Sequence, residues 1–260
     1  MNPLAPPFDV KLMNLAATAL FSACLVLLVA AAGWWALRHP LFAISGIVVQ
    51  GDVVHNSAMT FRANVAPRLA GNFFTVSLAA ARQAFEGVPW VRQAVVRREF
   101  PNRLRVHLQE HQAVALWGSD GESRLVNTFG EVFEANVGDV DQEALPRLSG
   151  PQEQSAQVLA MYRGVSPVFE PLGLTVDRLA LTARGNWQLE LDTGAVIELG
   201  RGSPDELSAR AQRFVQTLTQ VTSRHGRRPE ALVSADLRHV DGYAVRLRGV
   251  GTTSADAAKK

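Results

Sequence analysis

The sequence predicts an α+β protein with one N-terminal transmembrane helix, a small β-α-α-β-β domain and a larger β-rich domain with two helices. Three observations carry this prediction. A long run near the N-terminus has no charged residue, short strands with period-two alternation dominate the rest, and four helix-like segments interrupt these strands. The 260 residues suit two small domains and an anchor better than one domain.

The run Leu12–Leu37 contains no Asp, Glu, Lys or Arg. About 20 apolar residues cross the hydrocarbon core, so this run can span a membrane with some tilt. Trp34 and Trp35 lie near its end, where indole rings favour the membrane–water interface. A cleaved signal peptide is the alternative, because Ala30-Ala31-Ala32 resembles a cleavage site, but a signal's apolar region is typically only about 7–15 residues long. We therefore predict a retained anchor after a short tail over residues 1–11.

Five elements in the order β-α-α-β-β are expected after the anchor. They are a strand over Ile44–Val49, helices over Ser57–Leu69 and Ser77–Phe85, and hairpin strands over Val91–Glu99 and Arg103–Gln109. Ser57 can cap the first N–H groups of the first helix. The last strand alternates, which predicts that one face is buried and one is wet. The inward residues are then Leu104, Val106 and Leu108, and the outward ones Arg103, Arg105, His107 and Gln109.

The remainder of the chain predicts a β-rich domain with two helices. The expected strands cover Ala113–Trp117, Leu125–Asn127, Val132–Glu134, Leu174–Thr182, Trp187–Leu191, Ala195–Leu199, Ala231–Leu237 and Tyr243–Arg248. One helix should begin just after Pro151 and end near Arg163, because Gly164 and Pro167 follow. The other should begin at Ser203-Pro204-Asp205-Glu206, which combines a capping serine, a first-turn proline and early acids, and end near His225.

The motifs that suggest chemistry are better explained by structure. His107-Leu108-Gln109-Glu110-His111 spells a zinc-hydrolase pattern, but on a strand the two histidines lie about 13 Å apart and cannot share one ion. Gly200-Arg201-Gly202 lacks the Lys-Ser/Thr of a phosphate-binding loop. Cys24 is the only cysteine and lies within the anchor. We predict no catalytic, cofactor or metal site and no enzymatic activity, and a formal charge of +2 gives no reason to expect nucleic acid.

Short motifs in a fixed order behind the anchor resemble the FtsQ/DivIB family of bacterial cell-division proteins, which contain a POTRA domain followed by a β-domain. The motifs include Val49-Gln50-Gly51, Gly71-Asn72-Phe73-Phe74, Pro89-Trp90-Val91, Pro101 to Val106, Leu125-Val126-Asn127, Gly130 to Phe133, Leu199 to Gly202 and Asp236-Leu237-Arg238. The resemblance implies a POTRA domain over 42–110 and a β-domain over 111–249. The small residues from Thr252 to Lys260 predict a disordered tail, placed over 250–260.

The resemblance also implies a location and a function. The chain would be a single-pass type II protein of the inner membrane at the division septum, with residues 1–11 in the cytoplasm and both domains in the periplasm. Charges flanking the anchor do not decide this orientation. It would act as a non-catalytic divisome scaffold that binds FtsB and FtsL and links ring assembly to septal wall synthesis. No small-molecule substrate is expected.

The last strand is the expected partner-binding site, because a terminal strand is often a sheet edge that recruits a partner strand. Gly242 allows close backbone approach, and Tyr243 offers an aromatic anchor with a polar tip. Together with the positions that the resemblance implies, the predicted contact residues are Arg184, Arg238, His239, Asp241, Gly242, Tyr243, Val245 and Leu247.

Two other functions remain open. The first is a POTRA-containing secretion or outer-membrane assembly factor. Barrel-forming members of that class need many strands of about 10 residues, and only 150 residues follow Glu110. The second is an anchored periplasmic hydrolase, for which the sequence offers no convergent catalytic set.

Overall fold

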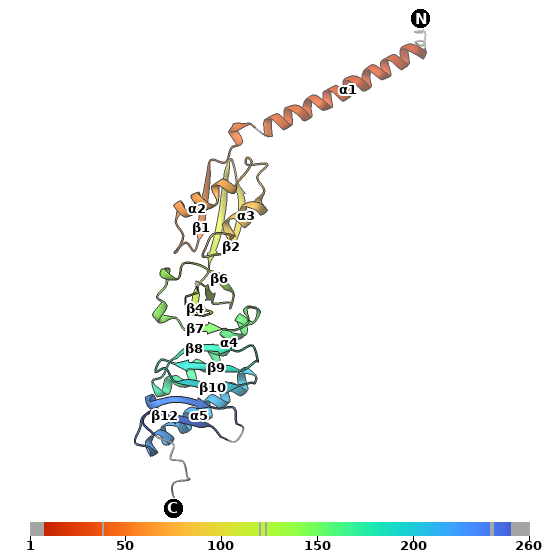
Figure 1. The fold of residues 1–260 in the computed structure, drawn as a ribbon. Coiled ribbons are helices and arrows are strands. Elements are labelled where there is room, and N and C mark those ends of the chain that lie inside the picture. Colours follow the sequence, from red (N-terminus) through yellow and green to blue (C-terminus); the bar gives the residue numbers. More distant parts are fainter. Residues whose placement is uncertain (1–7, 38, 120, 123, 240–241, 251–260) are drawn as a thin grey trace, which may run out of the picture. The chain divides into compact units, whose positions relative to one another are not determined.

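The computed structural model describes residues 8–37, 39–119, 121–122, 124–239 and 242–250. The chain divides into two compact units, Met1–Glu110 and His111–Lys260. Figure 1 gives the order of the helices and strands within each unit. The predicted α+β class is confirmed, with one long apolar helix, a small mixed domain and a β-rich domain with helices.

Helix α1 spans Phe8–Leu37 and contains the one segment of the described residues that is long and apolar enough to cross a membrane, Phe8–Trp35, with a mean hydropathy of 2.4. The helix begins four residues before the predicted run and so includes Asp9 and Lys11. Asp9 lies in the first turn, where a carboxylate interacts favourably with the helix N-terminus. Of the predicted tail over 1–11, residues 1–7 lie outside the described part of the chain.

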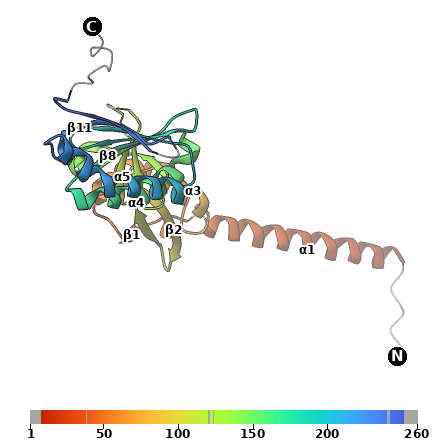
Figure 2. The ribbon, with the colours of Figure 1, turned by 90° about the horizontal axis from the view of Figure 1, so that it is seen from below.

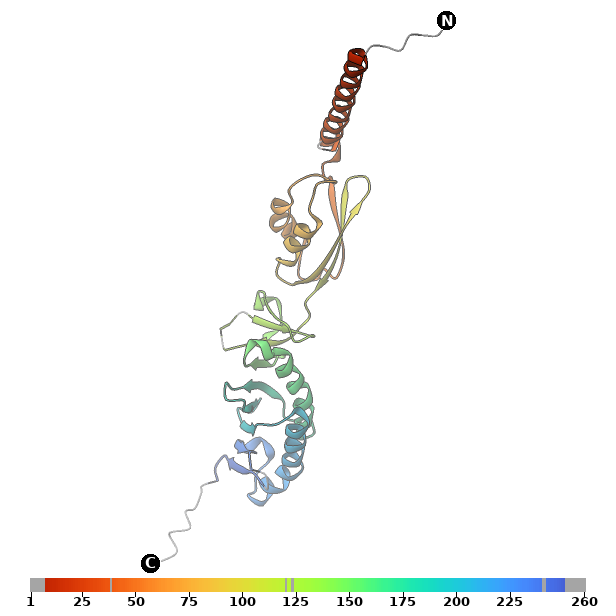
Figure 3. The ribbon, with the colours of Figure 1, turned by 90° about the vertical axis from the view of Figure 1, so that its right-hand side faces the viewer.

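The first unit has a three-stranded sheet with two helices on one face (Figure 3). The strand order is β1-β3-β2, with β1 parallel and β2 antiparallel to the central β3. The elements are β1 Gly46–Gly51, α2 Ala58–Asn64, α3 Leu78–Glu86, β2 Val91–Glu99 and β3 Arg103–Glu110, with 3-10 turns at Pro40–Phe42 and Ala66–Arg68. Ser57 caps α2 as predicted, and Ser77 caps α3, since their hydroxyls accept the N–H groups of Thr60 and Ala80.

The alternation of β3 sets the core of this unit. Leu104, Val106 and Leu108 are fully buried, as predicted, and Val106 and Leu108 belong to the core cluster that includes Phe61 and Phe85. The helix predicted over Ser57–Leu69, with an irregular last turn at Pro67, consists of α2, which ends at Asn64, and a following 3-10 turn that contains Pro67. Proline has no N–H to donate, and the residues of this turn are not buried, so no packing offsets the lost hydrogen bond.

The second unit has a nine-stranded sheet in the order β12-β11-β10-β9-β8-β7-β4-β5-β6. Its strands are β4 Ala113–Trp117, β5 Arg124–Asn127, β6 Val132–Glu134, β7 Arg147–Ser149, β8 Val176–Leu181, β9 Trp187–Leu191, β10 Val196–Gly200, β11 Leu232–Asp236 and β12 Ala244–Leu247. Eight of these strands were predicted to within two residues at each end. The short β7 was missed, although it joins the two halves of the sheet by pairing parallel to both β4 and β8.

Two long helices, α4 Ser155–Phe169 and α5 Pro204–Arg224, cover one face of this sheet (Figures 2 and 3). The start of α5 has the predicted capping box, in which Ser203 and Glu206 satisfy each other's backbone N–H groups. The predicted end of α4 at Arg163 was wrong, because the helix continues through Pro167. Burial of Val165 and Phe169 in the core outweighs the hydrogen bond that this proline removes.

Candidate functional site

Strand β12 is an edge of the nine-stranded sheet. Among the described strands it pairs with β11 alone, with Val245 opposite Ala235 and Asp236 opposite Ala244. Its side chains alternate between the two faces. Leu247 is buried in the core and Val245 packs against it, whereas Ala244 and Arg246 are exposed. Any contact that Leu247 makes with a partner therefore comes from its backbone.

The backbone of β12 presents hydrogen-bonding groups outside the sheet. The N–H of Arg248 donates to the carbonyl of Ala231, at 2.8 Å, and so points toward the β11 side. Backbone groups of successive residues alternate in direction along an antiparallel strand. Arg246 and Ala244 therefore also face β11, and the N–H and C=O of Val245 and the N–H of Leu247 face the free edge. A partner strand can pair with these groups.

Tyr243 lies just before β12 and rests on helix α5. Its ring packs edge-to-face on Phe214 with 4.9 Å between ring centres, and its hydroxyl lies 2.6 Å from Oγ1 of Thr217. Phe214 is fully buried, so the tyrosine ring packs against a residue that the core holds in place. Tyr243 itself stays half-exposed, so one face of its ring is available to a partner.

A groove of about 350 Å³ lies between α5 and the segment that leads into β12. Arg210 and Arg213 line it from the helix, and His239 and Tyr243 from the opposite side. Arg210 donates to the carbonyl of Leu199. The two arginines favour a partner segment that carries acidic side chains beside its apolar ones.

An ion pair fixes the chain where β11 ends. Arg238 donates from Nε to Oδ1 of Asp236, at 2.9 Å, and from Nη2 to Oδ2, at 2.5 Å. This bidentate hydrogen bond from Arg238 lowers the pKa of the Asp236 carboxyl to about 2. The pair also turns the guanidinium toward its own strand. Arg238 therefore supports the end of β11, and its predicted partner contact stays a prediction.

The other predicted contact residues have varied positions. Arg184 is exposed in the turn between β8 and β9, and this turn lies at the same end of the sheet as the segment between β11 and β12. His239 and Gly242 are exposed, and a Cβ added to Gly242 would meet no atom within 4 Å. Gly242 thus leaves open space beside the edge. Asp241 lies outside the described residues.

Sequence reasoning missed the helix side of this groove. The signal was present, because the apolar stripe Leu207, Ala211, Phe214 and Leu218 sets which face of α5 is buried. Arg210, Arg213 and Thr217 flank that stripe. What the sequence did not indicate was which of the late strands would lie beside this part of the helix.

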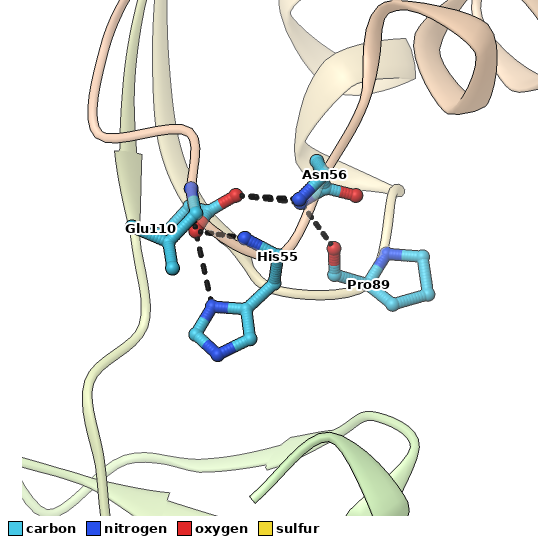
Figure 4. Close-up of polar contacts among 5 residues, drawn as sticks. His55, Asn56, Pro89 and Glu110 are labelled. Atoms are coloured by element: carbon cyan, nitrogen blue, oxygen red, sulfur yellow. Dashed lines mark hydrogen bonds and ion pairs between the residues drawn. The ribbon is translucent and has the colours of Figure 1, made fainter.

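A second group of residues closes one end of the first unit and is named the closed end: Val54, His55, Asn56, Pro89 and Glu110 (Figure 4). The buried carboxylate of Glu110 accepts the N–H groups of Val54, His55 and Asn56 at 2.9, 3.0 and 3.2 Å. It also bonds the side chains of His55 and Asn56, and Asn56 donates to the carbonyl of Pro89. The His55 ring stacks on Trp90.

The carboxylate of Glu110 is charged in spite of its burial. Burial raises its pKa, but the hydrogen bonds from His55, Asn56 and Val54 together outweigh that effect and leave the pKa below its ordinary value. Sequence reasoning noticed Glu110 only as part of the zinc-like motif. It follows Leu104, Val106 and Leu108 in the inward phase of β3, and an inward acid indicates a buried carboxylate with donors around it.

The zinc-like motif does not assemble. His107 is exposed on the outer face of β3, and the ring of His111 stacks on Phe133 with 4.1 Å between centres. In the part of the chain that the structure describes, no group of three or more His, Cys, Asp or Glu residues could hold a metal ion.

Two family models match nearly all of the chain after the anchor. Residues 42–111 match the FtsQ-type POTRA domain. Residues 115–238 match the C-terminal region of cell division protein FtsQ/DivIB. The two matches meet where the chain divides into its two compact units.

Several proteins named cell division protein FtsQ are similar to the chain over almost its whole length. The protein from Burkholderia pseudomallei is 42% identical over 97% of this chain and 99% of its own length. The protein from Thiomonas arsenitoxydans is 40% identical over 96% of this chain and 93% of its own. The protein from Bordetella pertussis is 38% identical over 92% of both.

Proposed function

Because this chain belongs to the FtsQ/DivIB family of cell-division proteins, we propose that it acts in the divisome as a non-catalytic scaffold that binds partner membrane proteins through the edge of β12. The family is defined by a cell-division role and not by a reaction. The FtsQ-type POTRA match also favours this role over secretion or outer-membrane assembly.

One observation carries the proposal: β12 is an edge whose Val245 backbone groups point outward beside the Tyr243 groove. Backbone pairing provides affinity, and the groove selects side chains on the added strand. The opposite edge of the sheet, among the described strands, is β6. The carbonyl of Glu131 accepts the N–H of Asn127 and so faces β5. The backbone groups of the next residue, Val132, therefore point away from the sheet, as those of Val245 do. The β12 edge has the Tyr243 groove beside it.

The partners we propose are FtsB and FtsL, bound on the periplasmic side of the inner membrane at the septum. In this arrangement α1 runs with its N-terminus in the cytoplasm, and both units lie outside. Binding there would link assembly of the division ring to septal wall synthesis. Arg184 and the groove arginines would contact acidic residues of the partner.

Two proline substitutions at matched positions test the proposed edge. Val245→Pro removes an outward N–H from β12, and Val132→Pro removes one from β6; both valines are half-buried and pack against the same core. We expect Val245→Pro to weaken binding of the full chain to the periplasmic segment of FtsB by about tenfold, the value of one lost hydrogen bond. Val132→Pro should leave binding within about twofold of wild type.

The measurement is isothermal titration with full-length protein in nanodiscs, after thermal unfolding has shown that both variants fold. Equal affinity in the two folded variants would place the interface elsewhere. Arg184→Glu supplies a second measurement that leaves the backbone intact. We expect a severalfold loss that shrinks at high salt, because an exposed charge contact is screened.

A further inference from the structure

An exposed aromatic and basic tip lies at the end of the first unit that is tied to the membrane anchor. We name it the hairpin tip and define it as residues 97–105, the turn between β2 and β3 with its flanking residues. Phe100 is 82% exposed at the turn. Arg97, Arg98, Arg103 and Arg105 are exposed around it, and Glu99 is the only acid, so the segment carries an excess of three positive charges.

Hydrogen bonds and a ring contact hold the hairpin tip close to the chain that leaves the anchor. The N–H of Ser45 donates to the carbonyl of Asn102 at 2.9 Å, and its hydroxyl donates to Oδ1 of Asn102 at 2.7 Å. The carbonyl of Phe42 accepts the N–H of Phe73 at 2.8 Å, and its ring packs edge-to-face on Phe74. The tip is therefore fixed to residues 42–45, only a few positions beyond α1.

Arg98 connects the hairpin to the loop that contains Phe73 and Phe74. Its guanidinium donates from Nε to the carbonyl of Phe73 at 2.7 Å and from Nη2 to the carbonyl of Val76 at 2.8 Å. The loop that carries the half-exposed Phe74 is thus bound to the hairpin. Arg98 positions the tip, and the outward face of the sheet carries Arg97, Arg103 and Arg105.

Chain length limits how far this tip can be from the bilayer. Trp34 and Trp35 mark the interface end of α1. From Trp35 to Phe42 the path consists of helix, a few linking residues and a 3-10 turn, and it spans at most roughly 18 Å at the usual rise per residue. The headgroup layer occupies roughly 5–7 Å of that distance. Phe42 therefore stays within roughly 18 Å of the interface end of α1, and the hairpin tip is bonded to Ser45, three residues further along the chain.

We propose that the hairpin tip docks on the surface of the anionic bilayer. Phe100 enters the headgroup layer, and Arg97, Arg103 and Arg105 contact lipid phosphates. Aromatic rings favour the interface, and basic residues near an anionic leaflet are attracted to it over about one Debye length. Arg105 also pairs with Glu99 at 2.5 Å, which leaves Arg97 and Arg103 as the residues whose charge is least compensated by the hairpin itself.

Docking would restrict the first unit to a small range of orientations above the membrane. The arrangement needs no new segment, because the contacts of Ser45 and Phe42 already hold the tip near the anchor. A different membrane protein that covers Phe100 is the competing occupant, and the experiment distinguishes the two.

The test measures the depth of residue 100 in the full chain. A Cys24→Ala background carries either Phe100→Cys or Val54→Cys with a spin label, in nanodiscs of phosphatidylcholine alone or of equal parts phosphatidylcholine and phosphatidylglycerol. Val54 is the matched control because it is 83% exposed and belongs to the closed end, beyond the opposite end of β1. We expect the label at 100 to be several times less accessible to a water-soluble nickel complex in anionic discs, with the label at 54 unchanged.

Charge variants test whether the arginines cause the protection of the label at residue 100. Arg97→Glu with Arg103→Glu should remove the protection at residue 100, and the milder Arg97→Gln with Arg103→Gln pair should reduce it. Arg224→Glu on α5 is the matched control and should leave it intact. Equal accessibility at 100 and 54 in anionic discs, in protein with wild-type circular dichroism, would overturn the proposal. So would protection that persists in neutral discs, or that appears only after another membrane protein is added.

Discussion

The closed end of the first unit and the free edge of the second treat their polar groups in opposite ways. At the closed end, three backbone N–H groups and two side chains converge on one buried carboxylate. At the edge, the backbone groups of Val245 point away from the sheet. A buried polar group is stable only when its partners are internal, whereas an edge group stays hydrated until a partner strand replaces water. The first arrangement supports a fold, and the second supports binding.

The largest expected effect comes from breaking the closed end. Glu110→Gln replaces one acceptor oxygen with an NH₂ group that faces N–H donors, and it removes the charge that those donors stabilise. We expect the free energy of unfolding to fall by about 3 kcal/mol, measured by urea denaturation of the full chain. Glu134→Gln on the exposed side of β6 is the control and should change it by less than about 0.5 kcal/mol. Similar values for both would mean that the Glu110 contacts do not hold this loop.

Protonation of Glu110 at low pH should lower the free energy of unfolding as Glu110→Gln does. The pKa of Glu110 is lowered from 4.5 on folding, so its stabilisation is complete above pH 4.5 and is lost as the pH falls through the lowered pKa. The stability difference between wild type and Glu110→Gln should therefore narrow below about pH 4.5. Binding at the β12 edge should stay at the wild-type level in Glu110→Gln at neutral pH. Loss of binding there would mean that the two regions are coupled.

A smaller effect is expected where the edge is supported by an exposed ion pair. Asp236→Asn removes the acceptor of Arg238 at the end of β11 and should cost about 1 kcal/mol, because solvent screens a pair of this kind. The pKa of Asp236 is lowered from 3.8 to about 2, so its contribution is present above pH 3.8 and is lost as the pH falls toward 2. Unfolding curves across that range should converge for wild type and Asp236→Asn. Asp52→Asn, at an exposed acid of the first unit, is the control and should change the free energy of unfolding at neutral pH by less than about 0.5 kcal/mol.

Local pattern predicted most of the elements. The strand β9 alternates between apolar and polar residues, and the start of α5 follows from its capping box. The missed strand β7 has three residues between Pro146 and Gly150, too few for a period to be visible. It forms because its backbone pairs with β4 and β8, and the three residues of β7 alone do not indicate that pairing.

The candidate site was predicted only in part for a related reason. A late strand with a glycine and a tyrosine beside it indicates an edge, but the groove needs α5, which lies about thirty residues earlier in the chain. Arg238 illustrates the same limit. The structure pairs it with Asp236, two residues away, and its predicted partner contact stays a prediction. Which charges are compensated internally depends on side-chain geometry that spacing alone does not give.

The smallest expected effect separates the aromatic part of Tyr243 from its hydroxyl. Tyr243→Phe keeps the ring on Phe214 but removes the hydrogen bond to Thr217, which also bonds backbone carbonyls of its own helix. Because this bond is exposed, its loss should cost about 0.5 kcal/mol. A double-mutant cycle with Thr217→Val measures that coupling by urea denaturation. Tyr243→Ala should weaken partner binding by about tenfold, since it removes the ring, while Tyr243→Phe should change it by less than about twofold. If Tyr243→Phe weakened binding as much as Tyr243→Ala, the hydroxyl would contact the partner directly, and the edge would depend on a side-chain hydrogen bond as well as on backbone pairing.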